Sequence, residues 1–168
     1  MTDDIAKEIT IHKIATFDNL ISYKGDFKDK DGKVYIKLEK MDRTLDDRIK
    51  EEEKLEKPFP LIKIWAYVIQ LCWGVAYLNM LGVCHMDIKP DNILLKGRTL
   101  KIADFGVSKR IAELNEESKD TYIGPDWKAT LRTSTPEMIQ GKNLRFNVDT
   151  WGVGCILYQM LTYKHPFV

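Results

Sequence analysis

Residues 85–92 read HMDIKPDN and gather polar and charged side chains between a long apolar segment and a run of alternating residues. The tripeptide Asp104-Phe105-Gly106 follows, 12 residues after Asn92. Each piece alone is weak evidence, because a single aspartate in a loop is more often a turn former than a catalytic base. Their order and their setting between an apolar helix and short strands make a chance coincidence implausible.

The segments on either side of HMDIKPDN predict a long helix before it and short strands after it. Residues 64–84 carry no charged side chain, and this apolar helix is expected to end near Leu81. The run NILLKGRTLKIADF, residues 92–105, predicts two short strands. Residues 106–133 predict a long loop, and DTWGVGCILYQMLT, residues 149–162, predicts a second apolar helix.

The first third of the chain predicts mixed secondary structure. Four elements are expected there: a helix over 3–16, strands over 20–27 and 33–41 joined by the turn KDKDG, and a charged helix over about 44–57. Thr2 is the expected N-cap of the first helix, where Glu8 shares the apolar face with His12. Early strands followed by helices indicate the α+β class.

Composition limits the kind of protein and its partners. A chain of 168 residues with 44% hydrophobic and 30% charged residues is typical of one folded domain. The formal net charge of +1 gives no polycationic surface, so no nucleic-acid partner is expected beyond a nucleotide. Three cysteines without a CxxC pair and an acidic N-terminus without a signal-peptide pattern favour a cytoplasmic, or alternatively nuclear, location.

The uncharged stretch must also be weighed as a membrane span. Residues 64–84 have about the length that a transmembrane helix needs. Gln70, Asn79 and two glycines dilute the stretch, and its end runs directly into HMDIKPDN. A helix buried in a soluble core explains the same pattern, so the sequence predicts no membrane span.

Four motifs together resemble the eukaryotic protein kinase family of the serine/threonine type. HMDIKPDN resembles its catalytic loop, ADFG its metal-binding motif, TPEM its Ala-Pro-Glu motif, and DTWGVGCILYQML the buried helix that follows. The resemblance implies a partial kinase-like fold over residues 1–168. In it, residues 1–41 would be a remnant of the small lobe and the hinge, and residues 42–168 the first part of a mainly helical large lobe.

The resemblance also implies a role for each polar residue of the site. Asp87 matches the base that accepts the proton of the substrate hydroxyl, and Lys89 the cation beside the migrating phosphoryl group. Asn92 and Asp104 match the oxygen ligands of Mg²⁺. Thr130 lies where the family commonly has a threonine bonded to the catalytic pair, although an ordinary loop threonine stays the alternative.

The resemblance further places a nucleotide site for ATP near the predicted hinge. The residues that it assigns to this site are Leu38, Glu39, Met41 and Leu94. Glu8 falls where the family has the glutamate that pairs with a phosphate-binding lysine. Asp149 matches a buried aspartate that braces the catalytic loop, and His85 and Phe105 match interior packing residues that couple the two motifs.

The chain departs from the family pattern at three points. Gly25 and Gly32 are its only glycines before residue 34, so no G-x-G-x-x-G loop is present. No V-A-I-K-like strand supplies a lysine, and Met86 stands where many kinases have an arginine. The missing glycine-rich loop and lysine strand favour an incomplete domain, and Met86 removes the usual receptor for a phosphate on the activation segment.

Two functions therefore follow from the sequence. The first is a serine/threonine protein kinase that uses Mg-ATP to phosphorylate a protein substrate. The alternative is a truncated, kinase-like pseudoenzyme that acts as a protein-binding module without catalysis. The four residues Asp87, Lys89, Asn92 and Asp104 favour the kinase, whereas the missing glycine-rich loop favours the binding module.

Overall fold

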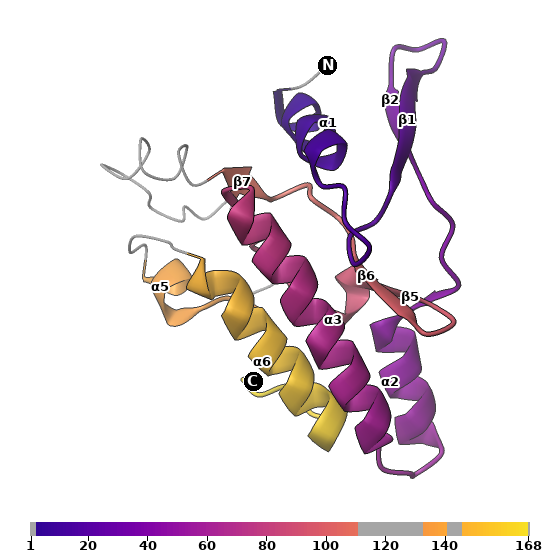
Figure 1. The fold of residues 1–168 in the computed structure, drawn as a ribbon, viewed down its shortest axis with the longest axis vertical. Helices are drawn as coiled ribbons and strands as arrows, with labels where there is room; N and C mark the ends of the chain where they lie inside the picture. Colours follow the sequence, from indigo (N-terminus) through magenta and orange to yellow (C-terminus); the bar gives the residue numbers. More distant parts are fainter. Residues whose placement is uncertain (1–2, 111–132, 141–145, 168) are drawn as a thin grey trace.

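The computed structural model describes residues 3–110, 133–140 and 146–167 as an α+β fold. Figure 1 shows a helix and a β-hairpin at one end and three longer helices that run side by side toward the other end. Small sheets lie between these two parts and carry the residues of interest. The expected fold class is therefore confirmed.

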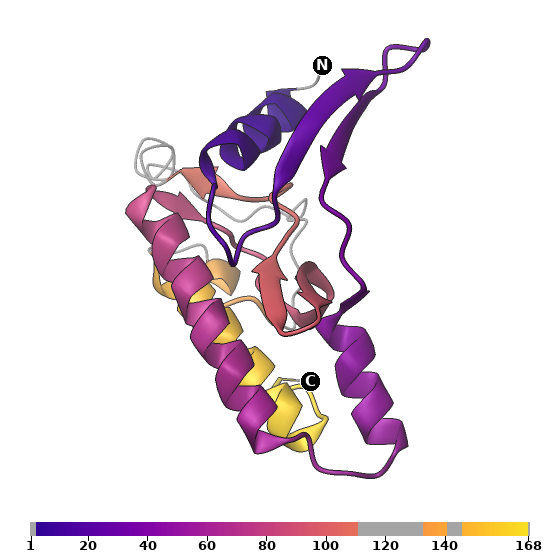
Figure 2. The same ribbon diagram turned by 45° about the vertical axis from the view of Figure 1, so that its right-hand side comes forward.

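The N-terminal part consists of helix α1 and one antiparallel hairpin. α1 covers Asp3–Ile14, β1 covers Tyr23–Lys28 and β2 covers Val34–Leu38. The hairpin extends away from the helical part, as Figure 2 shows. The helix and β2 lie within their predicted ranges, and β1 runs one residue past its range, to Lys28. The predicted N-cap Thr2 lies outside the described residues.

The loop after α1 is tied to the middle of the chain. The Asn19 side chain donates to the carbonyl oxygen of Leu100 at 2.9 Å, and Ile21 N donates to Ile102 O at 2.9 Å. Both partners lie on β6, Thr99–Ile102, which pairs with β5, Ile93–Lys96, in an antiparallel ladder. The N-terminal part is thereby fixed to the strands that flank the two motifs.

Two helices follow the hairpin. α2 covers Leu45–Lys54, and its N-cap Thr44 forms a capping box with Asp47, which explains why the helix begins there. α3 covers Leu61–Met80, after a segment with Pro58 and Pro60. The charged helix is shorter than predicted, because Leu55 already caps its C-terminus.

Several short elements depend on pairing between distant segments. β3 (Arg43–Thr44) adds to β5, and β4 (Val83–Cys84) pairs with β7 (Lys109–Arg110). The 3-10 helix η1 covers Pro90–Asn92, and α5 covers Pro136–Ile139. The predicted loop over 106–133 falls largely outside the described residues, but its first part forms β7.

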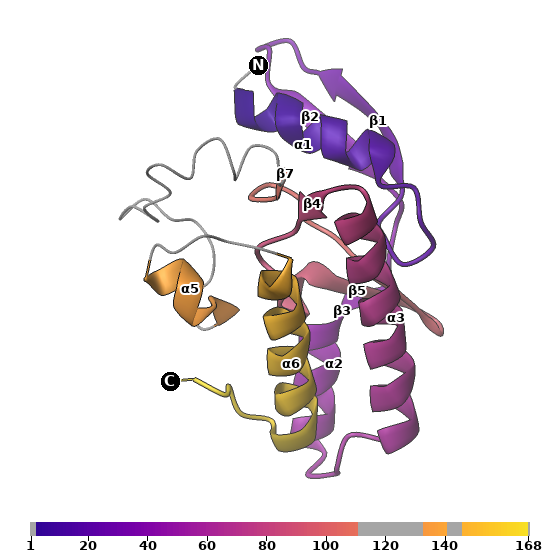
Figure 3. The same ribbon diagram turned by 60° about the vertical axis from the view of Figure 1, so that its left-hand side comes forward.

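Helix α6, Asn147–Thr162, packs along α3 and closes the core from the C-terminal side. Figure 3 shows the two helices side by side. On another side, α3 lies so close to β6 that it requires glycine, because a Cβ atom on Gly74 would lie 2.8 Å from Ile102 Cδ1. A Cβ atom on Gly152 would lie 2.6 Å from Ile88 Cβ, so α6 also presses directly on the catalytic-loop motif.

The expectation of a buried α3 is only half correct. One face, which includes Leu71, Gly74 and Leu78, is buried, whereas Trp65 and Trp73 on the opposite face are exposed. By length and composition α3 is the one described helix that could cross a membrane, with a third of its most apolar window buried in the protein. The buried face assigns the helix to the protein core.

The contact at Gly152 generates a stability prediction. Gly152→Ala forces Cβ into Ile88 and is expected to lower the free energy of unfolding by about 1–3 kcal/mol. Gly154→Ala, two residues on in the same helix, meets no atom within 4 Å and is expected to raise it by about 0.5–1 kcal/mol. Urea unfolding measures the free energy of unfolding of both variants. Equal changes in the two variants would contradict the close contact between Gly152 and Ile88.

Candidate active site

The loop at residues 85–89 is held by a carboxylate from α6. Asp149 is 1% exposed and accepts the backbone N–H groups of His85 and Met86, each at 2.8 Å. Burial raises the pKa of its carboxyl above the usual range, and the His85 ring and the two N–H donors act in the opposite direction. The predicted bracing role of Asp149 is confirmed.

Both motifs contain one residue in the left-handed backbone region. Met86 and Asp104 each have φ of 69°, a conformation that costs non-glycine residues about 1–3 kcal/mol. The conformation at Met86 is held by its N–H bond to Asp149. At Asp104 the turn is closed by Gly106 N, which donates to Asp104 Oδ1 at 3.2 Å. Such backbone strain is typical of functional turns.

His85 and Phe105 join the two motifs through the interior. The His85 ring packs on Phe105 edge to face, with centroids 5.5 Å apart, and both side chains are buried. His85 Nε2 donates to Ala103 O at 3.0 Å while Nδ1 accepts from Asp87 N at 3.3 Å, so both ring nitrogens are occupied by the backbone. The predicted packing role is confirmed.

The catalytic-loop side chains form a compact polar group. Asp87 Oδ2 lies 2.7 Å from Lys89 Nζ and accepts a hydrogen bond from Asn92 Nδ2 at 2.9 Å. Asn92 Nδ2 also donates to the Asp87 carbonyl oxygen at 3.0 Å. Asp87 and Asn92 are almost fully buried, and the Lys89 side chain is 21% exposed. The structure therefore brings together three residues that the sequence assigned to one site.

Asp104 lies exposed at the start of its turn, next to the buried Phe105. A Cβ atom on Gly106 would lie 3.2 Å from Asp104 Oδ1 and 3.9 Å from Glu8 Oε2, so the α1 carboxylate reaches this turn. Asn92 O accepts from Ala103 N at 2.9 Å, which ties the turn to the catalytic loop. Glu8 thus faces the Asp104–Gly106 turn.

The donor set suits a magnesium ion that is shared with a nucleotide. Both amide hydrogens of Asn92 are donated to Asp87, so Oδ1 is its remaining ligand atom. Asp104 supplies a carboxylate. Mg²⁺ is commonly held by one or two protein oxygen ligands together with phosphates and water. Within the described ranges, no group of three or more His, Cys, Asp and Glu forms a separate metal site.

The predicted nucleotide residues lie along the connection from β2 to β3 and on β5. Leu38, Met41 and Leu94 are half-buried and pack against the core beneath them. Glu39 N donates to Ser22 O at 3.0 Å, which aligns the hinge segment with the N-terminal loop.

The Glu39 carboxylate makes a paired contact that the sequence did not predict. Its Oε1 lies 2.6 Å from Lys101 Nζ and accepts from Ser22 N at 2.7 Å. Partial burial opposes ionisation, but the hydrogen bonds from Lys101 and Ser22 outweigh it and lower the pKa of Glu39 to about 2. Lys101 lies within β6, and a lysine in a strand does not by itself predict a contact with the segment around Glu39.

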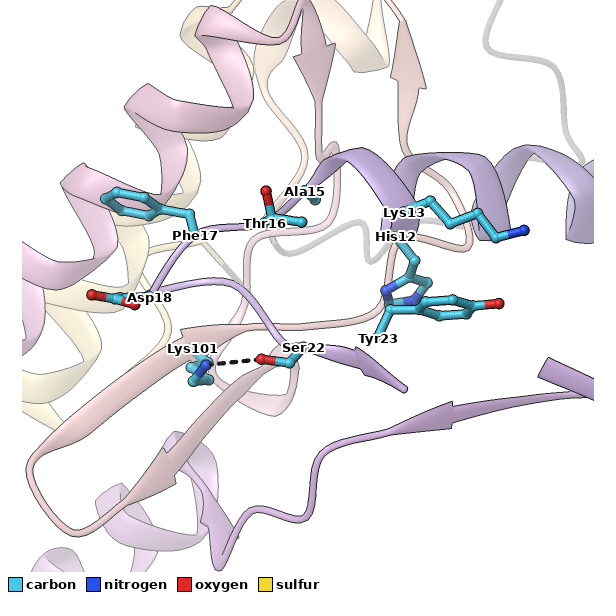
Figure 4. Close-up of a pocket in the computed structure, with 9 residues that line it drawn as sticks. All are labelled: His12, Lys13, Ala15, Thr16, Phe17, Asp18, Ser22, Tyr23 and Lys101. Carbon is cyan, nitrogen blue, oxygen red and sulfur yellow. Dashed lines mark hydrogen bonds between the residues drawn. The ribbon is translucent and has the colours of Figure 1, made fainter. Parts of the chain in front are cut away.

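A cavity of about 320 Å³ lies beside this pair, between the end of α1 and β6. Figure 4 shows Lys101 with its bond to Ser22 on one side and His12, Lys13 and Tyr23 on the other. His12 is 1% exposed and packs edge to face on Phe105, with centroids 4.8 Å apart. Of the predicted catalytic, metal and nucleotide residues that the structure describes, none lines this cavity.

The remaining assignments have mixed outcomes. Thr130 lies outside the described residues, so its predicted role stays a prediction. Two residues at the site were missed: Ser108 Oγ donates to His85 O at 3.1 Å, and Lys101 pairs with Glu39. Both contacts join segments that are distant in sequence, and no local pattern marks them.

Comparison with known proteins gives the same family along the whole chain. The family described as protein kinase domain matches residues 1–168. The probable serine/threonine-protein kinase CCRP1 of Zea mays is 35% identical over 167 residues, which cover 97% of this chain and 25% of the relative.

Two further relatives carry related names. Protein kinase MCK1 of Saccharomyces cerevisiae is 35% identical over 176 residues, which cover 99% of this chain and 44% of the relative. Serine/threonine-protein kinase polo of Drosophila melanogaster is 33% identical over 164 residues, which cover 96% of this chain and 27% of the relative. The chain thus spans between a quarter and a half of the length of these relatives.

The ion pair at the hinge generates a pH prediction. The folded-state pKa of Glu39 lies below its ordinary value of 4.5, so ionised Glu39 stabilises the fold above that value. We expect Glu39→Gln to be less stable than the wild type at neutral pH, with the difference shrinking as the pH falls from 4.5 toward 2. Denaturant unfolding across this range measures the effect. In a Lys101→Met background, the stability difference caused by Glu39→Gln is expected to depend less on pH. If its pH dependence stayed the same as in the wild-type background, Lys101 would not be the partner of Glu39.

Proposed function

Because the chain belongs to the protein kinase domain family, we propose that it carries the catalytic loop of a kinase that transfers the γ-phosphoryl group of ATP to serine or threonine hydroxyls of proteins. The observation that carries this proposal is the polar group of Asp87, Lys89 and Asn92, joined at 2.7 and 2.9 Å and held on a strained, braced loop. The names of the relatives support the hydroxyl specificity.

Asp87 is the proposed base. Its carboxylate is nearly buried, and the hydrogen bond from Asn92 Nδ2 to Oδ2 fixes its orientation. A substrate hydroxyl that reaches the carboxylate therefore meets a preoriented proton acceptor. The Lys89 ammonium group lies beside the same oxygen and would compensate negative charge on a phosphoryl group that approaches it. These two roles require positioning and charge and no covalent step by the protein.

Asn92 and Asp104 are the proposed holders of the metal. When bound, Mg²⁺ neutralises charge on the nucleotide phosphates and helps to align them. The protein contributes Asn92 Oδ1, whose amide nitrogen is occupied by Asp87, and the exposed Asp104 carboxylate. Leu38, Glu39, Met41 and Leu94 are the proposed contacts of the adenine ring. The first three lie at the end of β2 and on the connection to β3, and Leu94 lies on β5, two residues after Asn92.

A second candidate function is a kinase-like binding module without catalysis. The observation that favours it is the absence, from these 168 residues, of a G-x-G-x-x-G loop and of a V-A-I-K-like lysine strand. Such a module would bind Mg-ATP weakly or not at all and would act through protein contacts. The two functions differ in whether nucleotide binding depends on Asp104.

The assignment of Asp104 as a metal ligand predicts that its loss weakens ATP binding only when Mg²⁺ is present. We expect Asp104→Asn to weaken Mg-ATP binding by roughly 10–100-fold, because a charged metal ligand is lost, and to leave metal-free ATP binding nearly unchanged. Calorimetry with and without Mg²⁺ measures both. Asp91→Asn, an exposed aspartate of the same loop, is the matched control. Equal Mg-ATP affinities of wild type and Asp104→Asn would favour the binding module.

The assignment of Asp87 as the base predicts a loss of phosphoryl transfer without a loss of Mg-ATP binding. Asp87→Asn is expected to reduce phosphoryl transfer to a serine- or threonine-containing peptide by roughly 10²–10⁴-fold while Mg-ATP affinity changes little. Radiolabelled phosphate transfer and calorimetry on the same samples separate the two effects. Transfer that persists at the wild-type rate in Asp87→Asn would overturn the role of this residue.

A further inference from the structure

Two neighbouring cavities lie where the first turns of α3 meet α2 and the β5–β6 hairpin. The first, of about 320 Å³, has three basic side chains in its lining, those of Arg43, Arg48 and Lys63. The second has a volume of about 410 Å³. Lys63 and Tyr67 line both, so the two cavities adjoin at these side chains. Figure 2 shows the β5–β6 hairpin between α3 and α2, with which it is in contact.

The Tyr67 hydroxyl group lines both cavities without a partner in its own chain. Tyr67 is 4% exposed, and its hydroxyl forms no hydrogen bond with any residue that the structure describes. The oxygen is not sealed in the core, so it opens into the cavities. Burial raises the pKa of Tyr67, and the positive charges of Arg48 and Arg43 act in the opposite direction. A protonated, unpaired hydroxyl in a buried side chain is a hydrogen-bond donor that a ligand can satisfy.

The two arginines of the first cavity are held in place by α2. Glu51 Oε2 lies 2.7 Å from Arg43 Nη1 and 2.8 Å from Arg48 Nη1. Glu52 binds the second terminal nitrogen of Arg48. These ion pairs balance the charges of the two guanidinium groups, fix their positions and leave some of their N–H groups for a further acceptor.

Lys63 and Arg98 are the cations without an anionic partner at this place. Neither side chain forms an ion pair with a residue in the described part of the chain. Lys63 is half-buried and lies in the first turn of α3, which begins at Leu61 without a side-chain cap. The positive end of the helix dipole therefore adds to the charge of the lysine. The site has two uncompensated positive charges and a buried donor close together.

We propose that these cavities bind a phosphate monoester carried by a peptide, with the phosphorylated serine or threonine side chain in the first cavity. A phosphate monoester carries a charge of about −1.5 to −2 at pH 7, which Lys63 and Arg98 balance. Its three free oxygens accept from the Lys63 ammonium group, the Arg48 guanidinium group and the Tyr67 hydroxyl. The proposal does not depend on the proposed kinase function.

The second cavity favours a peptide as the carrier of the phosphate. Besides Lys63 and Arg98, it is lined by Ile62, Ala66 and Tyr67. An apolar side chain next to the phosphorylated residue would enter this cavity and bury its surface there. A nucleic acid is a poorer match, because its affinity comes from many phosphate contacts, whereas the unpaired charges here suit a single phosphate.

The proposed phosphate site and the proposed nucleotide site lie on opposite faces of β5. Leu95 lines the first cavity, whereas its neighbour Leu94 is a proposed adenine contact. Successive side chains of a strand point to opposite faces. Binding of the phosphopeptide is therefore expected to be independent of the catalytic loop, and Lys89→Met is expected to leave its affinity unchanged.

Fluorescence anisotropy with a labelled peptide tests the site. The probe is a short peptide in which a leucine follows one phosphoserine, and its dissociation constant is expected to lie below about 1 mM. The same peptide without the phosphate is expected not to bind, and inorganic phosphate is expected to displace the phosphopeptide. A third peptide, with glutamate in place of phosphoserine, is expected to bind at least about 10-fold more weakly, because it has less charge and fewer acceptor oxygens.

Four variants test the assigned contacts. Tyr67→Phe, which removes only the hydroxyl oxygen, and Lys63→Met are each expected to weaken phosphopeptide binding by about 10-fold. Asp42→Asn, which removes the carboxylate in the lining of the first cavity, is expected to strengthen binding by about 2–3-fold. Lys28→Met removes the same charge from an exposed lysine of β1 and is expected to change nothing. Circular dichroism confirms that each variant is folded.

The following outcomes overturn the proposal. If neither the phosphopeptide nor inorganic phosphate binds at about 10 mM, the cavities are no phosphate site. Binding that Tyr67→Phe and Lys63→Met leave intact, or that Lys89→Met abolishes, occurs elsewhere on the protein. Equal binding of the glutamate peptide assigns the site to acidic peptides. Co-sedimentation with vesicles that contain phosphatidic acid, without binding of the phosphopeptide, assigns it to a lipid headgroup.

Discussion

The buried carboxylate of Asp149 is the contact on which the site depends. A carboxylate that is 1% exposed is unfavourable without partners, and here its two oxygens each accept a backbone N–H at 2.8 Å. Those bonds hold Met86 in the left-handed region and so set the direction in which Asp87 leaves the backbone. Because Asp149 belongs to α6, the packing of that helix and the conformation of the catalytic loop are determined together.

Packed aromatic rings connect the loop that Asp149 holds to helix α1. His85 packs on Phe105, and Phe105 packs on His12 at 4.8 Å, so α1 and the two motifs share one line of rings. Both ring nitrogens of His12 lack a hydrogen-bond partner, and Glu8 Oε1 lies 3.8 Å from its Nε2. A shift of α1 would therefore be felt at Phe105, next to the proposed metal ligand Asp104.

The sequence predicted the helices and motifs that depend on neighbouring residues. It did not predict the short strands and the ion pair that form between distant segments. The spacing of Asp87, Lys89 and Asn92 places them within one turn and a short 3-10 helix, so the motif itself specified their closeness. The two-residue strands β3 and β4 exist only through pairing with β5 and β7, and no periodicity can mark so short an element. Lys101 was missed for the same reason, because its partner Glu39 is 62 residues away. The uncharged segment 64–84 predicted the α3 helix correctly, but hydrophobicity alone cannot tell whether both of its faces are covered by the same chain.

The hydrogen bonds and the ion pair that orient Asp87 among the described residues lie within the large-lobe part of the chain. Asp87 is oriented by Lys89 and Asn92, and the loop below it is held by Asp149. None of these contacts involves α1 or the β1–β2 hairpin, which instead reach the site through Phe105 and the Glu39–Lys101 pair. Alignment of the proposed base and binding of the nucleotide phosphates are therefore separable properties of this fold. The contacts that orient Asp87 can form without a bound nucleotide, so kinase activity would require both properties together.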